Sequence, residues 1–199
     1  MSYFAPAAAV ETVSEVKKSR FITRAGYADS REAAMMMLAQ AKQDYPDAGH
    51  HCWAYLLGNP KSAQSAAMSD DGEPSGTAGK PILNVLQHKG VGDVMVIVIR
   101  YFGGVKLGAG GLVRAYSGAA QQAMVELPVQ LRETLASISL SCDFRHEQVL
   151  RLWLDQHGAR NVAAEYAEHV MLSAELSQDK LTALQEFSAG LGVTLTVVE

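Results

Sequence analysis

The chain is short of cysteine, of long apolar runs and, over its last third, of positive charge. Its 199 residues hold two cysteines, Cys52 and Cys142, and neither belongs to a C-x-x-C pair. A disulfide framework or a structural zinc site is therefore not expected. No apolar run approaches the ~20 residues that a membrane-spanning helix needs. No basic segment precedes the apolar stretch at residues 5–10, so we expect no signal peptide, no membrane partner and a cytoplasmic location.

Positive charge is unevenly distributed along the chain. Residues 1–130 carry 12 Lys and Arg against 11 Asp and Glu, a net charge of +1. Residues 131–199 carry 5 against 10, a net charge of −5. Because nucleic-acid binding needs clustered Lys and Arg to neutralise phosphates, any such surface is expected on the N-terminal part.

Apolar periodicity predicts an α+β fold with two domains, residues 1–128 and residues 131–199. Within the first domain, residues 94–99 form an unbroken, β-rich apolar run, typical of a strand that is buried on both faces. After Pro128 the pattern changes to a βαββαβ order over about 70 residues, which is the ferredoxin-like arrangement. No catalytic cluster is visible in this second part.

Two polar, glycine-rich segments, residues 69–81 and residues 100–116, flank the predicted buried strand. The first leads into a helix that Pro81 suits, and helix N-termini favour anions. The second holds five glycines, lets a ligand approach the backbone, and leads into a helix predicted from Gly111 to Glu126. We predict that both segments share one anion- or nucleic-acid-binding face. Its candidate residues are Lys18, Arg20, Ser75, Thr77, Lys80, Arg100, Gly104, Lys106, Gly108, Gly110 and Arg114.

Asp70, Asp71 and Glu73 place three carboxylates within four residues of the first segment. Two nearby carboxylates can act as an acid/base pair or hold a divalent cation. The same pattern also fits a turn whose acids cap helices and meet arginines, and the sequence leaves both interpretations open. His50 and Cys52 face one way on a predicted strand, but two ligands do not make a metal site. We therefore predict no metal, no cofactor and no catalytic residue.

The two segments, with Lys18-Ser19-Arg20-Phe21 and with His50 and Cys52 before Ala54-Tyr55, resemble the bacterial branch of the IMPACT family. The likeness covers most of residues 10–128. It implies that the first domain resembles the second domain of ribosomal protein S five. It also implies that the second domain is similar to the ferredoxin-like domains of elongation factor G. Eukaryotic members restrain a stress-activated kinase through a further N-terminal domain, so that role is not implied here. The family supplies no established catalytic residues to transfer.

Two functions follow from these patterns. The first is a non-enzymatic factor that associates with RNA or the ribosome, is connected with the regulation of translation, and uses the glycine-rich face. The alternative is an enzyme or sensor for a phosphorylated small molecule at the same face, with the three acids supplying its chemistry. Small-molecule kinases with the S five-like fold also place glycines before a helix. Their Gly-Leu-Gly-Ser-Ser pattern is missing here, where Leu112-Val113 follows Gly110-Gly111, and we favour the first function.

Overall fold

The computed structural model describes residues 2–198, and their contacts divide the chain into two units. Residues 3–131 form the first unit, and residues 132–198 together with Ser2 form the second. Both units combine helices with antiparallel strands, so the predicted two-domain α+β class is confirmed. The first unit reaches Leu131 because β7 (Val129–Arg132) pairs with β1 (Tyr3–Pro6) in a small two-stranded sheet. None of the helices in residues 2–198 is long and apolar enough to cross a bilayer.

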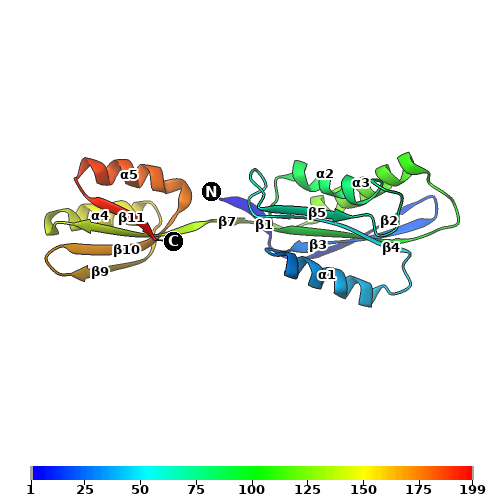
Figure 1. Ribbon diagram of the computed structural model, residues 1–199, viewed down its shortest axis with the longest axis horizontal. Coiled ribbons are helices and arrows are strands. Elements are labelled where there is room, and N and C mark those ends of the chain that lie inside the picture. The colour runs from blue at the N-terminus through cyan, green and yellow to red at the C-terminus, as the bar shows by residue number, and fades with distance from the viewer. Residues whose placement is uncertain (1, 199) are drawn as a thin grey trace. The chain divides into compact units, whose positions relative to one another are not determined.

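The first unit is a five-stranded antiparallel sheet with helices on both faces (Figure 1). Its strands are β2 (Val10–Val16), β3 (Ser19–Tyr27), β4 (His50–Leu57), β5 (Ser65–Ser69) and β6 (Val94–Tyr101). Its helices are α1 (Arg31–Asp44), α2 (Gly79–Lys89) and α3 (Ala109–Glu126). The strand order is β2-β3-β6-β4-β5. Helices α2 and α3 cover one face of this sheet, and α1 covers the other.

Strand β6 is the centre of the sheet, and the prediction that it is buried on both faces is confirmed. Val94, Val96 and Val98 pack beneath α2 and α3, whereas the alternate residues Met95 and Ile97 pack against the side that α1 covers. All of them are fully buried. Because successive strand residues point to opposite faces, one apolar run serves two cores.

The register of the strands brings three loops to the same end of the sheet. Arg100, near the end of β6, pairs with Phe21 near the start of β3 and with His50 at the start of β4. Ser69, at the end of β5, pairs with Trp53. The β2–β3 turn, the loop before α2 and the loop before α3 therefore all lie where β6 ends.

The β2–β3 turn consists of Lys17 and Lys18, both in the left-handed backbone region with φ of 46° and 66°. Two-residue hairpins of this kind favour Asn and Gly, because those residues tolerate positive φ at little cost. The loop before α3 packs directly against this turn. A Cβ atom at Gly103 would lie 1.9 Å from the Lys18 carbonyl oxygen, so only glycine fits at that position.

The second unit has the predicted βαββαβ order. Its elements are β8 (Leu135–Cys142), α4 (Phe144–Gln156), β9 (Arg160–Tyr166), β10 (Val170–Ser177), the 3₁₀ turn η1 (Gln178–Lys180), α5 (Leu181–Gly190) and β11 (Thr194–Val198). The antiparallel order β11-β8-β10-β9 is the ferredoxin-like arrangement. Apolar residues of β8 and β10 pack against α4 and α5.

Candidate functional site

The two predicted segments line one cavity of about 280 Å³ in the first unit. Glu73 and Pro74 come from the loop before α2, and Arg100 comes from the end of β6. The rest of the lining belongs to the loop before α3 and to the start of that helix: Phe102, Lys106, Leu107, Gly108, Ala109 and Leu112. We call this space the Arg100 cavity. Residues 27 positions apart in the sequence thus meet at one place.

The backbone N–H groups at the start of α2 already bind a carboxylate of the chain itself. Asp70 Oδ1 accepts hydrogen bonds from the backbone N–H groups of Ala78 and Gly79, at 3.0 and 2.8 Å. Its Oδ2 accepts one from the N–H of Gly76 at 2.8 Å. Burial raises the pKa of Asp70, but the three donors outweigh burial, and the pKa lies below its ordinary value. The anion that this glycine-rich stretch holds is therefore Asp70.

The neighbouring residues of this loop are also engaged within the fold or exposed. The hydroxyl of Thr77 is buried and donates to the Pro74 carbonyl at 2.6 Å. Ser75 and Lys80 are exposed. Of the anion contacts predicted here, Ser75 in the loop and Lys80 in the first turn of α2 therefore remain accessible to a ligand.

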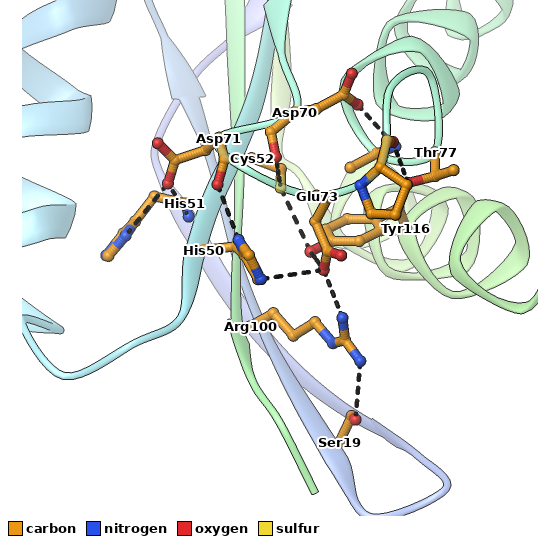
Figure 2. Close-up of polar contacts among 12 residues, drawn as sticks. Ser19, His50, His51, Cys52, Asp70, Asp71, Glu73, Thr77, Arg100 and Tyr116 are labelled. Atoms are coloured by element: carbon orange, nitrogen blue, oxygen red, sulfur yellow. Dashed lines mark hydrogen bonds and ion pairs between the residues drawn. The ribbon is translucent and has the colours of Figure 1, made fainter. Parts of the chain in front are cut away.

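Asp71 turns away from Asp70, toward β4 and α1 (Figure 2). Its Oδ2 accepts a hydrogen bond from the His51 N–H at 2.6 Å, and its Oδ1 lies 3.6 Å from the Lys42 ammonium. Its carbonyl oxygen accepts a hydrogen bond from His50 Nδ1 at 2.8 Å. Asp71 therefore fixes the loop to the edge of β4.

Glu73 is buried and forms an ion pair with Arg100. Its Oε1 accepts hydrogen bonds from Arg100 Nη1 at 2.5 Å and from the Tyr116 hydroxyl at 2.8 Å. The guanidinium carbon of Arg100 lies 5.7 Å from the ring centroid of Phe21 and also of Phe102. A buried carboxylate and a buried guanidinium tolerate their loss of water only as a pair, so each holds the other in place.

Figure 2 shows that the three side-chain carboxylates point to different partners, while His50 lies between two of these residues, bonded to the Asp71 carbonyl oxygen and 3.9 Å from Glu73 Oε1. Asp70 binds the α2 N-terminus, Asp71 binds β4, and Glu73 binds Arg100 and Tyr116. An acid/base pair needs two carboxylates aimed at one point, and this arrangement does not provide it. Nor does any group of three His, Cys, Asp or Glu residues within residues 2–198 have the arrangement of a metal site.

Cys52 and Tyr116 complete the network on the side of α3. The Cys52 thiol donates to the Asp70 carbonyl oxygen at 3.0 Å, and its sulfur lies 3.4 Å from the Tyr116 hydroxyl. Burial raises the pKa of Cys52 to about 12 and also raises the pKa of Tyr116. Because the thiolate is the reactive form, Cys52 is an inert structural residue at neutral pH.

Sequence reasoning missed Ser19 and Tyr116 as members of the network. Tyr116 lies on the buried face of α3 and is fully buried. A buried tyrosine hydroxyl usually has a hydrogen-bond partner, and this was the available signal. Ser19 Oγ lies 3.4 Å from Arg100 Nη2 and 3.3 Å from the Gly103 nitrogen, contacts that depend on strand register.

A second cavity, of about 260 Å³, adjoins the Arg100 cavity because both are lined by Leu107. Its other lining residues are Val16, Lys17, Gly111, Arg114 and Ala115. Lys17 and Arg114 therefore border one cavity and Lys106 the next. We call these three residues the basic strip; within residues 2–198 none of them forms an ion pair.

The remaining candidate residues are divided between this surface and other places. Lys18 is exposed at the β2–β3 turn, beside Lys17. Arg20 alternates with Phe21, which packs under α3, so it points to the opposite face of the sheet. Gly104 is exposed in the loop before α3. Gly110 lies inside α3, which begins at Ala109, two residues before the predicted start.

The start of α3 differs from that of α2. Gly108 precedes the helix with φ of 71°, the first turn contains no acidic residue, and no side chain among the described residues caps it. Uncapped N–H groups at a helix start carry a partial positive charge. This helix start lines the Arg100 cavity beside Lys106.

Comparison with known proteins gives matches over both units. Residues 17–124 match the model of the Impact N-terminal domain, and residues 140–189 match a domain of unknown function, DUF1949. The chain is 41% identical to the IMPACT family member YigZ of Escherichia coli K12 over 190 residues, which cover 96% of this chain and 92% of that protein. It is 33% identical to the IMPACT family member YvyE of Bacillus subtilis 168, over 96% of this chain and 87% of that protein.

One solved structure is similar over the whole length. It is the crystal structure of a hypothetical protein that is 39% identical in sequence, and the two structures superpose with a TM-score of 0.70. The match covers 100% of this chain and 98% of that one.

Proposed function

This chain belongs to the IMPACT family, and from that membership we propose that it is a non-enzymatic RNA- or ribosome-associated factor connected with the regulation of translation. The basic strip would hold the phosphate backbone of a single-stranded or looped RNA. The family resemblance described above, to ribosomal protein S five and to elongation factor G, supports translation as the setting.

The observation that carries the proposal is the basic strip across two adjoining cavities. Lys17 and Arg114 line one of these cavities and Lys106 lines the other. Single-stranded nucleic acids are held by such cationic grooves next to exposed aromatic rings. Phe102, which is 59% exposed, supplies the ring beside Lys106.

The distribution of charge supports placing RNA on the first unit. Residues 131–199 have a net charge of −5, which repels phosphate. The first 130 residues are nearly neutral overall, so binding there depends on the local strip and not on bulk charge.

The alternative of an enzyme for a phosphorylated small molecule loses its main support. It relied on Asp70, Asp71 and Glu73 acting together, and each of these acids instead has its own partners in the fold. An anionic ligand at the start of α3 remains compatible with the structure, but it would be bound without an acid/base pair.

The test is RNA binding by variants of the basic strip at several salt concentrations. Lys106→Ala and Arg114→Ala should each weaken binding to all sequences and lower the slope of log affinity against log salt by about one. Lys61→Ala is the matched control, because Lys61 is an exposed lysine in the loop at the opposite end of β4. RNA affinity that is unchanged in both strip variants would contradict the proposal.

A further inference from the structure

Strand β11 lies at the edge of the sheet in the second unit. The strand order β11-β8-β10-β9 gives it one neighbour, β8. Within residues 2–198, no strand pairs with its outer side. An edge strand presents a row of backbone N–H and C=O groups, with which a strand of another molecule can pair.

The composition of β11 favours such pairing. Its sequence, Thr-Leu-Thr-Val-Val, contains no charged residue and no proline, and four of its five residues are β-branched. Val197 and Val198 are 48% and 53% exposed. Natural proteins usually protect their edge strands with charged side chains or proline, and β11 has neither form of protection.

The other edge strands of the two larger sheets are less suited to pairing. Strand β2 carries two glutamates, and β9 carries an arginine and a glutamate. Strand β5 is uncharged, but it contains two alanines, which have low strand propensity. The start of α2 also packs on this strand, because Gly79 lies against the backbone of Ser69. Strand β11 is therefore the edge that best fits a further strand.

The sequence of β11 is complementary to itself in antiparallel pairing. With a twofold axis at Thr196, Leu195 lies opposite Val197 of a second copy, and Thr196 lies opposite itself. Leu195 and Val197 are on the helix-covered face of the sheet, since they pair with the core residues Leu140 and Ile138. Apolar residues of the two copies would therefore meet where their cores adjoin, and no like charges would be opposed.

The register at Thr196 is the one that gives the longest overlap. A shift of one residue would bring the helix-covered face of one copy beside the open face of the other. A shift of two residues would keep the faces aligned but reduce the overlap from five residues to three. The axis at Thr196 pairs the whole strand and keeps the helices of both copies on one side.

Helix α5 adds an uncharged row beside this edge. It packs against β11 (Figure 1), and its Phe187 stacks on Trp153 of α4, with ring centroids 5.7 Å apart. Gln185 is two residues before Phe187, about 200° around the helix, so it points away from α4. Leu181 and Ala189 are four residues on either side of Gln185 and share its side of the helix.

We propose that a second copy of this chain binds along the outer edge of β11, so that two four-stranded sheets form one continuous antiparallel sheet. A twofold contact of this kind uses the same surface on both copies and closes as a dimer. It involves the five residues of β11 and the row on α5, fewer than the roughly 20–30 residues per side of a standard interface. The dissociation constant is therefore expected in the micromolar to millimolar range.

This inference does not depend on the proposed RNA function, and its response to salt is the opposite. Residues 131–199 have a net charge of −5, so two copies repel each other at long range. Salt screens this repulsion and should strengthen the dimer, whereas it weakens the binding of RNA.

The first experiment is sedimentation velocity of the full chain, at concentrations up to about 1 mM and at low and high salt. We expect a dimer that increases with protein concentration and with salt. Val197→Glu should weaken it at least about tenfold, because a carboxylate would be buried against Leu195 of the second copy. The matched control is Met68→Glu, which should have no effect, since Met68 is 46% exposed on the edge strand β5. A monomer under all conditions would overturn the inference, as would a dimer that survives Val197→Glu.

The second experiment tests the register by cross-linking. In Thr196→Cys the two new cysteines would lie opposite each other, with Cα atoms about 4.5–5.5 Å apart, a distance that a disulfide spans. In the control Thr194→Cys they would be about 14 Å apart. Oxidised glutathione should therefore yield a covalent dimer of the first variant and little of the second. Cys52 and Cys142 are buried, and the parent chain measures their contribution. Equal cross-linking of both variants, or of neither, would contradict the proposed pairing even if Val197→Glu fails to fold.

Discussion

The two glycine-rich loops have similar sequences, but their charged side chains are placed differently. The loop before α2 directs its acids inward, and Asp70 occupies the N–H groups at the start of its own helix. The loop before α3 has no acid in the first helical turn and leaves Lys106 exposed beside an uncapped helix start. Glycine before a helix makes N–H groups available in both. Whether a ligand can use them depends on whether the chain supplies its own anion.

The largest effect is expected at the ion pair that joins Glu73, in the loop before α2, to Arg100 at the end of β6. Glu73→Ala should destabilise the first unit by about 3–5 kcal/mol, because it leaves the Arg100 guanidinium buried and unpaired. Urea unfolding of the variant, compared with the control Asp47→Ala at an exposed position, measures the effect. A loss below about 1 kcal/mol would mean that Arg100 finds water or another partner, and that the ion pair holds the loop before α2 less firmly than the contacts indicate.

A smaller loss is expected when the internal anion of α2 is removed. Asp70→Ala should cost roughly 2–4 kcal/mol, since three backbone donors lose a charged acceptor. The loss should also depend on pH. The pKa of Asp70 is lower in the folded state than its ordinary value of 3.8, so its stabilisation is present above about pH 4 and is lost as pH falls through the folded pKa.

Chemical denaturation of the parent chain and of Asp70→Asn at pH 7 and at pH 3 tests the direction of this pH dependence. The difference in unfolding free energy between the two proteins should shrink at the lower pH. A difference that stays constant or grows would show that Asp70 is not held as a carboxylate by the α2 N-terminus.

The smallest changes in stability are expected for Gly108, which precedes α3, and Gly118 within that helix. The two changes should have opposite signs. Gly108 has φ of 71° and ψ of 164°, a region open to glycine almost alone, so Gly108→Ala should destabilise by about 1–3 kcal/mol through backbone strain. Gly118 lies within the same helix with open space around it. Gly118→Ala should therefore stabilise by about 0.5–1 kcal/mol. Thermal unfolding of the two variants should shift the transition in opposite directions, and shifts of equal sign would contradict the conformational assignment of Gly108.

The sequence predicted those features that depend on nearby residues. The buried strand of residues 94–99, the helix that ends at Glu126 and the βαββαβ order of the second unit follow from local periodicity, and the structure has all three. The pairing of Arg100 with Glu73 depends on strand register, which no local pattern encodes. Sequence reasoning therefore placed Arg100 with the anion-binding residues and Glu73 with the acidic ones.

The role of Asp70 is a second feature that the sequence alone did not determine. The pattern fitted either a carboxylate for chemistry or one that caps a helix. The geometry shows Asp70 bonded to the backbone of Gly76, Ala78 and Gly79. A residue type and its spacing specify which groups are available, but the direction of a side chain in a loop is set by the loop's tertiary anchors.

The contact between Gly103 and the β2–β3 turn has a consequence for genetics. Because the Lys18 carbonyl oxygen occupies the place of a side chain at residue 103, a defect caused by Gly103→Ala could be relieved only by a displaced or remodelled hairpin. Second-site suppressors of such a mutation should therefore map to residues 17 and 18, which lie more than eighty positions upstream, and not to the neighbours of residue 103 in the chain.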